Sequence, residues 1–157
     1  MSNGVAGSEP EIVIRRMAPS DAIAAAELSS ELGYPVAPDV MEARLRQFSG
    51  MKDHAVFAAC RDGRVVGWVD VGIVHHLQSG SSGEIGGLIV ARAHQGRGIG
   101  GKLVKAAEDW IRGQNITNVV VRSRTTREAA HAFYLRLKFS RLKTSAVFNK
   151  TLEQPDA

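Results

Sequence analysis

Apolar and polar positions alternate in several short runs of this chain, which is the pattern of half-buried strands. Residues 11–16 (EIVIRR) alternate in this way, and residues 54–60 and 65–74 form longer apolar runs. The two longer runs are joined by a turn that contains Asp62 and Gly63. Because Asp-Gly between two apolar runs is a strong hairpin signal, the pattern predicts an early strand and, further along, a β-hairpin.

Apolar residues at helical spacing fill the stretch between the first strand and the hairpin. Residues 23–32 show this spacing after the helix-start signals of residues 19–21, and Met41, Leu45 and Phe48 repeat at i, i+4 and i+7. Two helices are therefore predicted here. After a flexible connection at 79–83, the remaining predictions are a strand at 84–90, a helix at 99–111, a strand at 119–121, a helix at 127–137 and a final strand at 145–152.

The order β-α-α-β-β-β-α-β-α-β predicts an α/β (α+β) fold, with a mixed sheet that carries helices on both faces. The chain has 157 residues, 44% of them hydrophobic, which is enough for one domain with a real core. Residues 1–10 are polar and predict a disordered leader, so the domain is expected to span residues 11–153.

Composition limits the compartment and the partners. Cys60 is the single cysteine, so no internal disulfide can form, and no Cys/His spacing indicates a metal site. No apolar run approaches the roughly 20 residues of a membrane helix, and a cytoplasmic location is expected. The net charge of +4 raises nucleic acid as a partner, but the cations are scattered and no basic stripe with interleaved aromatics is present. We therefore expect neither nucleic acid nor membrane as a partner.

The most informative stretch is residues 84–102, EIGGLIVARAHQGRGIGGK. A strand, a glycine-rich turn and a helix in this order point backbone N–H groups and the positive end of a helix dipole at one spot, which is an anion site. Gly86 and Gly87 in the middle of the strand indicate a bulge or a close backbone approach.

Two well-known phosphate motifs fail here. The frame Gly96, Gly98, Gly101 resembles a dinucleotide fingerprint, but it does not end a strand and no acidic residue follows about 20 positions on. A Walker pattern would need Ser or Thr after Lys102, where the chain has Leu103.

The spacing Gln95-x-x-Gly98-x-Gly100 is similar to the Q/R-x-x-G-x-G/A signature of the GNAT N-acetyltransferase superfamily. The predicted element order from residue 12 to residue 152 resembles the same family, as does the segment AAHAFYLRLKF around Tyr134, in which Lys138 replaces a glycine. The resemblance implies a twisted, mostly antiparallel sheet with splayed central strands. It also implies acetyl-CoA as the cofactor and no metal.

By this resemblance, main-chain groups of the central strand hold the thioester arm of the cofactor, and the glycine-rich turn holds its pyrophosphate. The implied cofactor-binding residues are Leu88, Ile89, Val90, Gln95, Gly96, Arg97, Gly98, Ile99, Gly100, Gly101 and Lys102.

The transfer of an acetyl group to an amine needs a base, because an amine with a pKa of about 10.4 is almost wholly protonated at pH 7. Glu84, which opens the strand before the glycine turn, matches a glutamate base of this family, with Asp70 or a water chain as alternatives. Tyr134 matches the general acid of the family. The resemblance therefore implies direct attack, with Glu84 and Tyr134 as catalytic residues.

The acceptor is expected to be a primary amine of a small molecule, since residues 32–36 (LGYPV) resemble the small-molecule branch of the family. Tyr34, Asp70 and His75 are the predicted substrate-binding residues. The alternatives are an acetyltransferase of protein N-termini or lysines, and an acyl-CoA-binding module without catalysis. A homodimer is left open.

Overall fold

The computed structural model describes residues 10–156, and most of the predicted leader lies outside this range. The chain forms two compact units, one up to Arg122 and one from Ser123 onward. The prediction of one domain over residues 11–153 stays a prediction.

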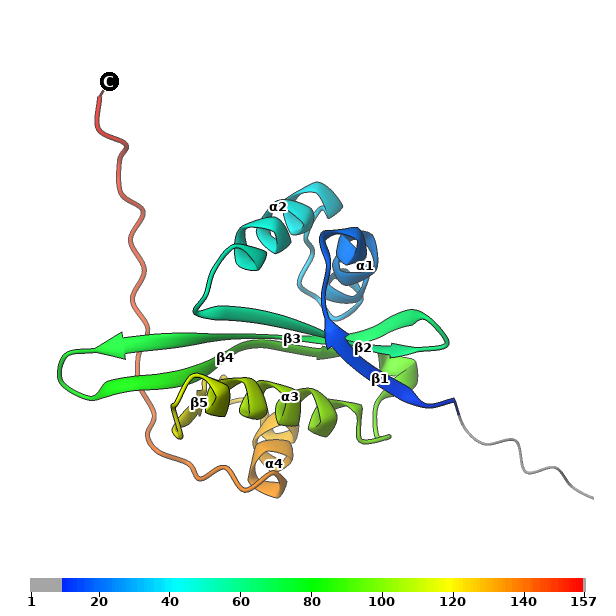
Figure 1. The fold of residues 1–157 in the computed structure, drawn as a ribbon. Coiled ribbons are helices and arrows are strands. Elements are labelled where there is room, and N and C mark those ends of the chain that lie inside the picture. Colours follow the sequence, from blue (N-terminus) through cyan, green and yellow to red (C-terminus); the bar gives the residue numbers. More distant parts are fainter. Residues whose placement is uncertain (1–9, 157) are drawn as a thin grey trace, which may run out of the picture. The chain divides into compact units, whose positions relative to one another are not determined.

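The first unit is built on a five-stranded sheet in the order β1-β2-β3-β4-β5 (Figure 1). The strands are β1 (Ile12–Arg16), β2 (His54–Arg61), β3 (Arg64–His76), β4 (Gly80–Val90) and β5 (Val119–Val121). All neighbours pair antiparallel except β4 and β5, which are parallel. The predicted hairpin is confirmed, and Asp62 and Gly63 both have positive φ (50° and 74°), as a tight hairpin turn requires.

Helices cover both faces of the sheet, as predicted (Figure 1). One face carries α1 (Ala22–Glu31) and α2 (Pro38–Ser49), and the other carries α3 (Ile99–Gly113). We call these the α1/α2 face and the α3 face. The largest fully buried side chains come from α3 and from β3: Ile99, Leu103, Val104, Ile111, Val69 and Val71.

A bulge interrupts the ladder between β3 and β4. Val69 pairs with Leu88, but Val71 pairs with Ile85, so Asp70 lies opposite both Gly86 and Gly87. The extra residue is therefore on β4, at the glycine pair where the sequence predicts a bulge.

The predicted splay of the central strands is also present. Within residues 10–122, β4 pairs with β5 only at Gly83, Glu84 and Ile85. From Gly86 to Val90, the edge of β4 that faces away from β3 therefore carries no strand partner in this unit.

The structure contradicts two of the predicted elements. The prediction of a flexible connection at 79–83 is wrong, because β4 already begins at Gly80, which pairs with His76 of β3. Glycine and serine have low strand propensity, but ladder hydrogen bonds use the backbone and tolerate them. The final strand at 145–152 is absent, since residues 137–156 contain no helix or strand. Alternation predicts the period of a strand, but a strand forms only where a partner edge is available.

The second unit contains α4 (Glu128–Arg136), which ends in a Schellman motif. The Phe139 N–H donates to the Tyr134 carbonyl at 3.0 Å, and the Lys138 N–H donates to the Leu135 carbonyl at 3.1 Å. Lys138 has φ 72°, the left-handed conformation that favours glycine. The lysine at this position is therefore strained, as its place in the motif suggests.

Candidate active site

The glycine-rich turn, which the sequence predicts to be an anion cradle, leads directly into the start of α3. Gly98 is the N-cap residue with φ 80°, and Gly96 also has positive φ (77°). The Lys102 N–H makes the first helical hydrogen bond, to the Gly98 carbonyl at 3.2 Å. The N–H groups of Ile99, Gly100 and Gly101 precede that bond and have no partner within the helix. The first turn of α3 carries no acidic side chain, so the positive end of the helix dipole is left for an anion.

Three cations surround this helix start. Arg61, Arg97 and Lys102 line a hollow beside Ile99 and the N-terminal end of β1. Arg97 and Lys102 are exposed and belong to the predicted cradle. Arg61, at the end of β2, was not predicted, because only the antiparallel pairing of β1 and β2 brings it to this position.

Gln95 links the cradle to the central strand. Its side-chain Nε2 donates to the Val90 carbonyl at 3.0 Å. This contact fixes the path of the chain between the end of β4 and the glycine turn. The binding role predicted for Gln95 stays a prediction.

The strand pairing defines which groups of β4 reach its open edge. The Ala91 N–H donates to the Val66 carbonyl at 2.8 Å, so the pair Val66–Ala91 is hydrogen-bonded. In an antiparallel ladder such pairs alternate with pairs whose N–H and C=O groups point the other way. Leu88 and Val90 therefore present their backbone groups to the open edge, while Ile89 faces β3. Of the three strand residues predicted to bind the cofactor, Leu88 and Val90 thus have backbone groups at the open edge, and the role of all three stays a prediction.

Asp70 holds the bulge of β4 together. Its Oδ1 accepts a hydrogen bond from the Gly87 N–H at 2.6 Å. A Cβ atom at Gly86 would overlap the Asp70 carboxylate, and one at Gly87 would lie 2.9 Å from Oδ1. Burial raises the pKa of Asp70, while the Gly87 N–H and the nearby His54 lower it to a smaller extent. The glycine pair thus makes room for a half-buried carboxylate beside the bulge.

Glu84 lies on the same face of the sheet as Asp70. It pairs with Gly72, two residues from Asp70 on β3, and cross-strand partners share a face. Gly83 next to it belongs to the other face, since a Cβ there would overlap Ile111 of α3. The Glu84 side chain is 25% exposed, and its Oε1 accepts from Arg122 Nε at 3.1 Å. The structure therefore brings both candidate bases to the α1/α2 face.

Two further side chains on this face were missed from the sequence. His54 pairs with Gly72, where a Cβ would touch its ring, and it stacks on Phe48 with centroids 5.1 Å apart. Trp68 lies two residues from Asp70, and its indole N–H is buried without a partner among the described residues. The sequence shows only that side chains alternate between the two faces along β2 and β3. It does not reveal which of the two faces carries the site.

The other two predicted acceptor residues are Tyr34 and His75. Tyr34 lies in the loop between α1 and α2, 47% exposed, and its backbone N–H donates to the Ser29 carbonyl. His75 lies near the end of the β3–β4 hairpin, is exposed, and contacts Ser81. Its odd position on β3 places it on the α3 face, opposite Asp70. The structure thus does not bring His75 to the face that carries the carboxylates.

Tyr134 belongs to α4 in the second unit. Its ring makes edge contacts with Phe133 and Phe139, at centroid distances of 5.1 and 5.5 Å. Burial raises the pKa of the Tyr134 phenol above its ordinary value, and Arg127 lowers it to a smaller extent. The phenol therefore stays protonated at neutral pH, as a proton donor must.

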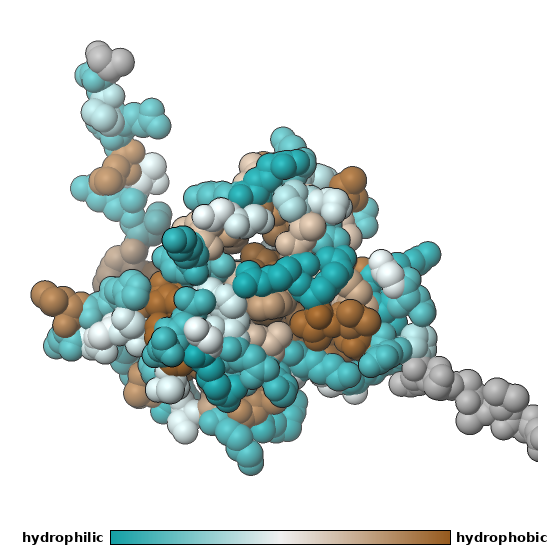
Figure 2. All heavy atoms as spheres, viewed as in Figure 1, coloured by the Kyte–Doolittle hydropathy of each residue, from teal (hydrophilic) through white to brown (hydrophobic). Residues whose placement is uncertain are grey.

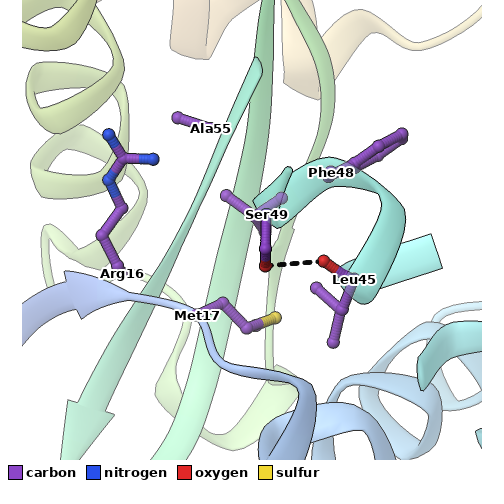
Figure 3. A pocket seen from close by; sticks show the side chains of 7 residues that line it. Arg16, Met17, Leu45, Phe48, Ser49 and Ala55 are labelled. Atoms are coloured by element: carbon purple, nitrogen blue, oxygen red, sulfur yellow. Dashed lines mark hydrogen bonds between the residues drawn. The ribbon is translucent and has the colours of Figure 1, made fainter. Parts of the chain in front are cut away.

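A small cavity of about 220 Å³ lies between α2 and the sheet (Figure 3). It is lined by Arg16, Met17, Leu45, Phe48, Ser49, Ala55 and Val56. It contains none of the predicted site residues, and it is smaller than the 300–1,000 Å³ of typical ligand pockets. We assign it no role in the chemistry.

Comparison with known proteins places the chain in a family. Residues 23–139 match the model of the acetyltransferase (GNAT) family. The chain is 32% identical over 145 residues to the aminoglycoside N(6')-acetyltransferase type 1 of Stenotrophomonas maltophilia, covering 89% of this chain and 94% of that protein. It is 28% identical over 100 residues to the enzyme of the same name from Klebsiella aerogenes, covering 62% and 66%.

Solved structures share the fold. Aminoglycoside N-acetyltransferase AAC(6')-Iy in complex with CoA superimposes with a TM-score of 0.84 and 18% identity, over 93% of this chain and 99% of that chain. The aminoglycoside acetyltransferase meta-AAC0020 from a soil metagenomic sample, in complex with sisomicin, gives a TM-score of 0.73 and 21% identity, over 90% and 97%.

The chain therefore belongs to the GNAT acetyltransferase family. It is an acetyl-CoA-dependent N-acetyltransferase, and the predicted fold class, enzyme class and cofactor are confirmed. The cradle, its cations and the open edge of β4 fit this cofactor. Among residues 10–156, no group of His, Cys, Asp and Glu is arranged to hold a metal ion, and no helix has the length and apolar character to cross a membrane.

Proposed function

We propose that this enzyme acetylates a primary amine of a small, amine-rich molecule of the aminoglycoside class. The observation that carries this proposal is the 32% identity to an aminoglycoside N(6')-acetyltransferase over nearly the whole chain. The carboxylates of Asp70 and Glu84 on the α1/α2 face support it, because an acceptor with several ammonium groups is attracted by acidic side chains.

In this proposal, the chain's own groups perform four tasks, while acetyl-CoA supplies the activated acetyl thioester. Glu84, directly or through water, takes the proton of the acceptor ammonium, and the amine nitrogen then bonds to the acetyl carbon as the carbon–sulfur bond breaks. The backbone N–H of Leu88 at the open edge of β4 stabilises the charge that develops on the carbonyl oxygen. Tyr134 donates its phenolic proton to the departing sulfur, and the second proton, which the new amide nitrogen loses, passes through water to restore the phenol. Asp70 keeps the bulge in shape beside the reacting amine.

An acceptor panel tests the proposed substrate class. The enzyme is incubated with acetyl-CoA and, separately, an aminoglycoside, a lysine-containing peptide and a peptide with a free N-terminus. CoA release and product mass are measured. We expect the aminoglycoside to gain one acetyl group with a kcat/KM at least about 100-fold above either peptide. A preference for a peptide would favour the protein acetyltransferase alternative, and binding without turnover would favour the acyl-CoA-binding module.

Two substitutions test the catalytic roles. Glu84→Gln should lower kcat by about 10²–10⁴-fold at pH 7. Its kcat should recover partly as the pH rises, because more of the amine is then neutral without a base.

Tyr134→Phe should slow turnover by about 10–10³-fold, at or below the usual general-acid range. The exposed residue Glu27 on α1 gives a matched control: Glu27→Gln should leave kcat and its pH dependence unchanged. A kcat of Glu84→Gln that equals wild type at every pH would remove Glu84 as the base.

A further inference from the structure

A hollow at the start of α3 gathers three cations. It has a volume of about 230 Å³, and its lining includes Glu11, Ile12, Ile99, Arg61, Arg97 and Lys102. Within residues 10–156, none of these three cations forms a salt bridge. Figure 2 shows hydrophilic side chains on the surface where Figure 1 draws the start of α3 below β1. Three cations and one acidic residue, Glu11, give the hollow an excess of positive charge.

Arg61 is the least exposed of the three cations. It lies half-buried at the end of β2, whereas Arg97 and Lys102 are exposed. Its Nη1 lies 3.5 Å from Nδ1 of His94, the last residue of the short helix η2 (Arg92–His94) between β4 and the predicted cradle. A half-buried guanidinium beside other cations is unfavourable unless an anion balances its charge. Arg61 is therefore placed to bind an anion from outside the chain.

The cofactor carries two anionic groups, a pyrophosphate and a 3'-phosphate, with one ribose ring between them. The pyrophosphate is expected at the backbone N–H groups of the predicted cradle. The 3'-phosphate is a monoester with a charge of about −1.5 to −2 at pH 7, and it needs donors of its own. The planar guanidinium of an arginine can bind a phosphate through two parallel hydrogen bonds. Arg61 fits this task, because it comes from β2 and not from the segment 95–102 that is predicted to hold the pyrophosphate.

We propose that Arg61 binds the 3'-phosphate of the cofactor, so that the enzyme selects CoA over 3'-dephospho-CoA. Arg97 and Lys102 line the same hollow and add positive charge beside this phosphate. The contact with His94 holds Arg61 next to the turn that leads into α3. This inference concerns only the cofactor of the enzyme and is independent of the proposed acceptor.

The test is isothermal titration calorimetry of the full-length protein with CoA and, separately, with 3'-dephospho-CoA, in the absence of any acceptor. Wild type should bind CoA about 10–100-fold more tightly than 3'-dephospho-CoA, which is the range of a hydrogen bond between charged groups. Arg61→Gln should weaken the binding of CoA by about 10-fold or more. It should change the binding of 3'-dephospho-CoA by less than about 2-fold, because that ligand lacks the group that Arg61 contacts.

Arg64 provides the matched control. It pairs with Arg61 across the β2–β3 hairpin, but it is exposed and does not line the hollow. Arg64→Gln therefore removes the same charge close by, and it should leave the preference for CoA within about 2-fold of wild type, since solvent screens an exposed charge. Arg61→Met keeps an unbranched stem without the charge and should reproduce the result of Arg61→Gln.

Three outcomes would overturn the proposal. The first is equal affinity of wild type for the two ligands. The second is equal weakening of both ligands in Arg61→Gln and Arg61→Met, which would mean that Arg61 acts on the pyrophosphate or on the fold. The third is a loss of preference in Arg64→Gln as large as in Arg61→Gln, which would reduce the effect to net charge. Binding of 3'-dephospho-CoA with wild-type affinity shows that the fold of each variant is intact.

Discussion

At the scale of single residues, the site depends on backbone conformations that few side chains allow. Gly86 and Gly87 leave space for the Asp70 carboxylate, and Gly96 and Gly98 supply the positive φ of the cradle. The sequence predicted all four positions, because paired glycines in a strand and glycines before a helix have few other uses. It did not predict that Asp70 binds the Gly87 N–H, since register is set by pairing that no local pattern contains.

Asp70 gives a pH-dependent prediction. Burial raises its pKa in the native state, so between about pH 4 and that raised value the native state holds more protons than the unfolded state. The contribution of Asp70 to stability therefore falls as the pH rises through this window. Asn at this position cannot titrate.

Urea unfolding of wild type and Asp70→Asn from pH 4 to pH 8 measures this effect. We expect the stability of wild type relative to the variant to decline with pH and then level off. Parallel stability curves over the whole range would contradict the assigned burial of this carboxylate.

Lys138 gives a second prediction at this scale. Its φ of 72° costs a non-glycine residue on the order of 1 kcal/mol. Lys138→Gly should therefore stabilise α4 and raise the free energy of unfolding by about 0.5–1 kcal/mol. Lys143→Gly in the same chain, outside helix and strand, is the control and should show no such gain. A destabilised Lys138→Gly variant, measured by urea unfolding, would mean that the lysine side chain makes a compensating contact.

At the scale of elements, the first strand is joined to α1 by a polar clamp. Arg15 donates to both carboxylate oxygens of Asp21, at 2.7 and 2.9 Å, and the Ala18 N–H donates to the same carboxylate at 2.8 Å. The hydrogen bond from Arg15 is the main reason why the pKa of Asp21 is lowered. The sequence predicted a helix start here but not the clamp, because the reach of Arg15 depends on how the chain turns after β1.

Asp21→Asn should lower the free energy of unfolding by about 1–2 kcal/mol at pH 7, a value reduced for screening because Arg15 is 41% exposed. A lowered pKa stabilises the fold above the ordinary pKa of Asp, near 3.9, and this contribution is lost as the pH falls through the native value. The two proteins should therefore converge in strongly acidic solution. The exposed Glu42–Arg46 pair is the control, and Glu42→Gln should cost only about 0.3 kcal/mol. Equal losses for both variants would contradict the clamp.

At the scale of the whole molecule, sequence patterns that reflect local backbone conformation predicted the structure correctly. The Asp62-Gly63 hairpin, the helices on both faces and the glycine cradle were all predicted from the sequence. Features that depend on which segments meet were not: the extension of β4 to Gly80, the approach of Arg61 to the cradle, and the missing strand at 145–152. The positions of His54 and Trp68 were also missed, because the sequence shows the alternation of the strands but not which face of the sheet carries the site.

The measurement that tests the central claim most directly compares an aminoglycoside with an analogue in which hydroxyl groups replace its primary amines. CoA release is followed at saturating acetyl-CoA. We predict turnover of the amine compound and a rate at least about 10³-fold lower for the hydroxyl analogue, because only an amine becomes a good nucleophile once a base has taken its proton. Equal rates for the two compounds, or turnover of neither, would contradict acetyl transfer to a primary amine of this class.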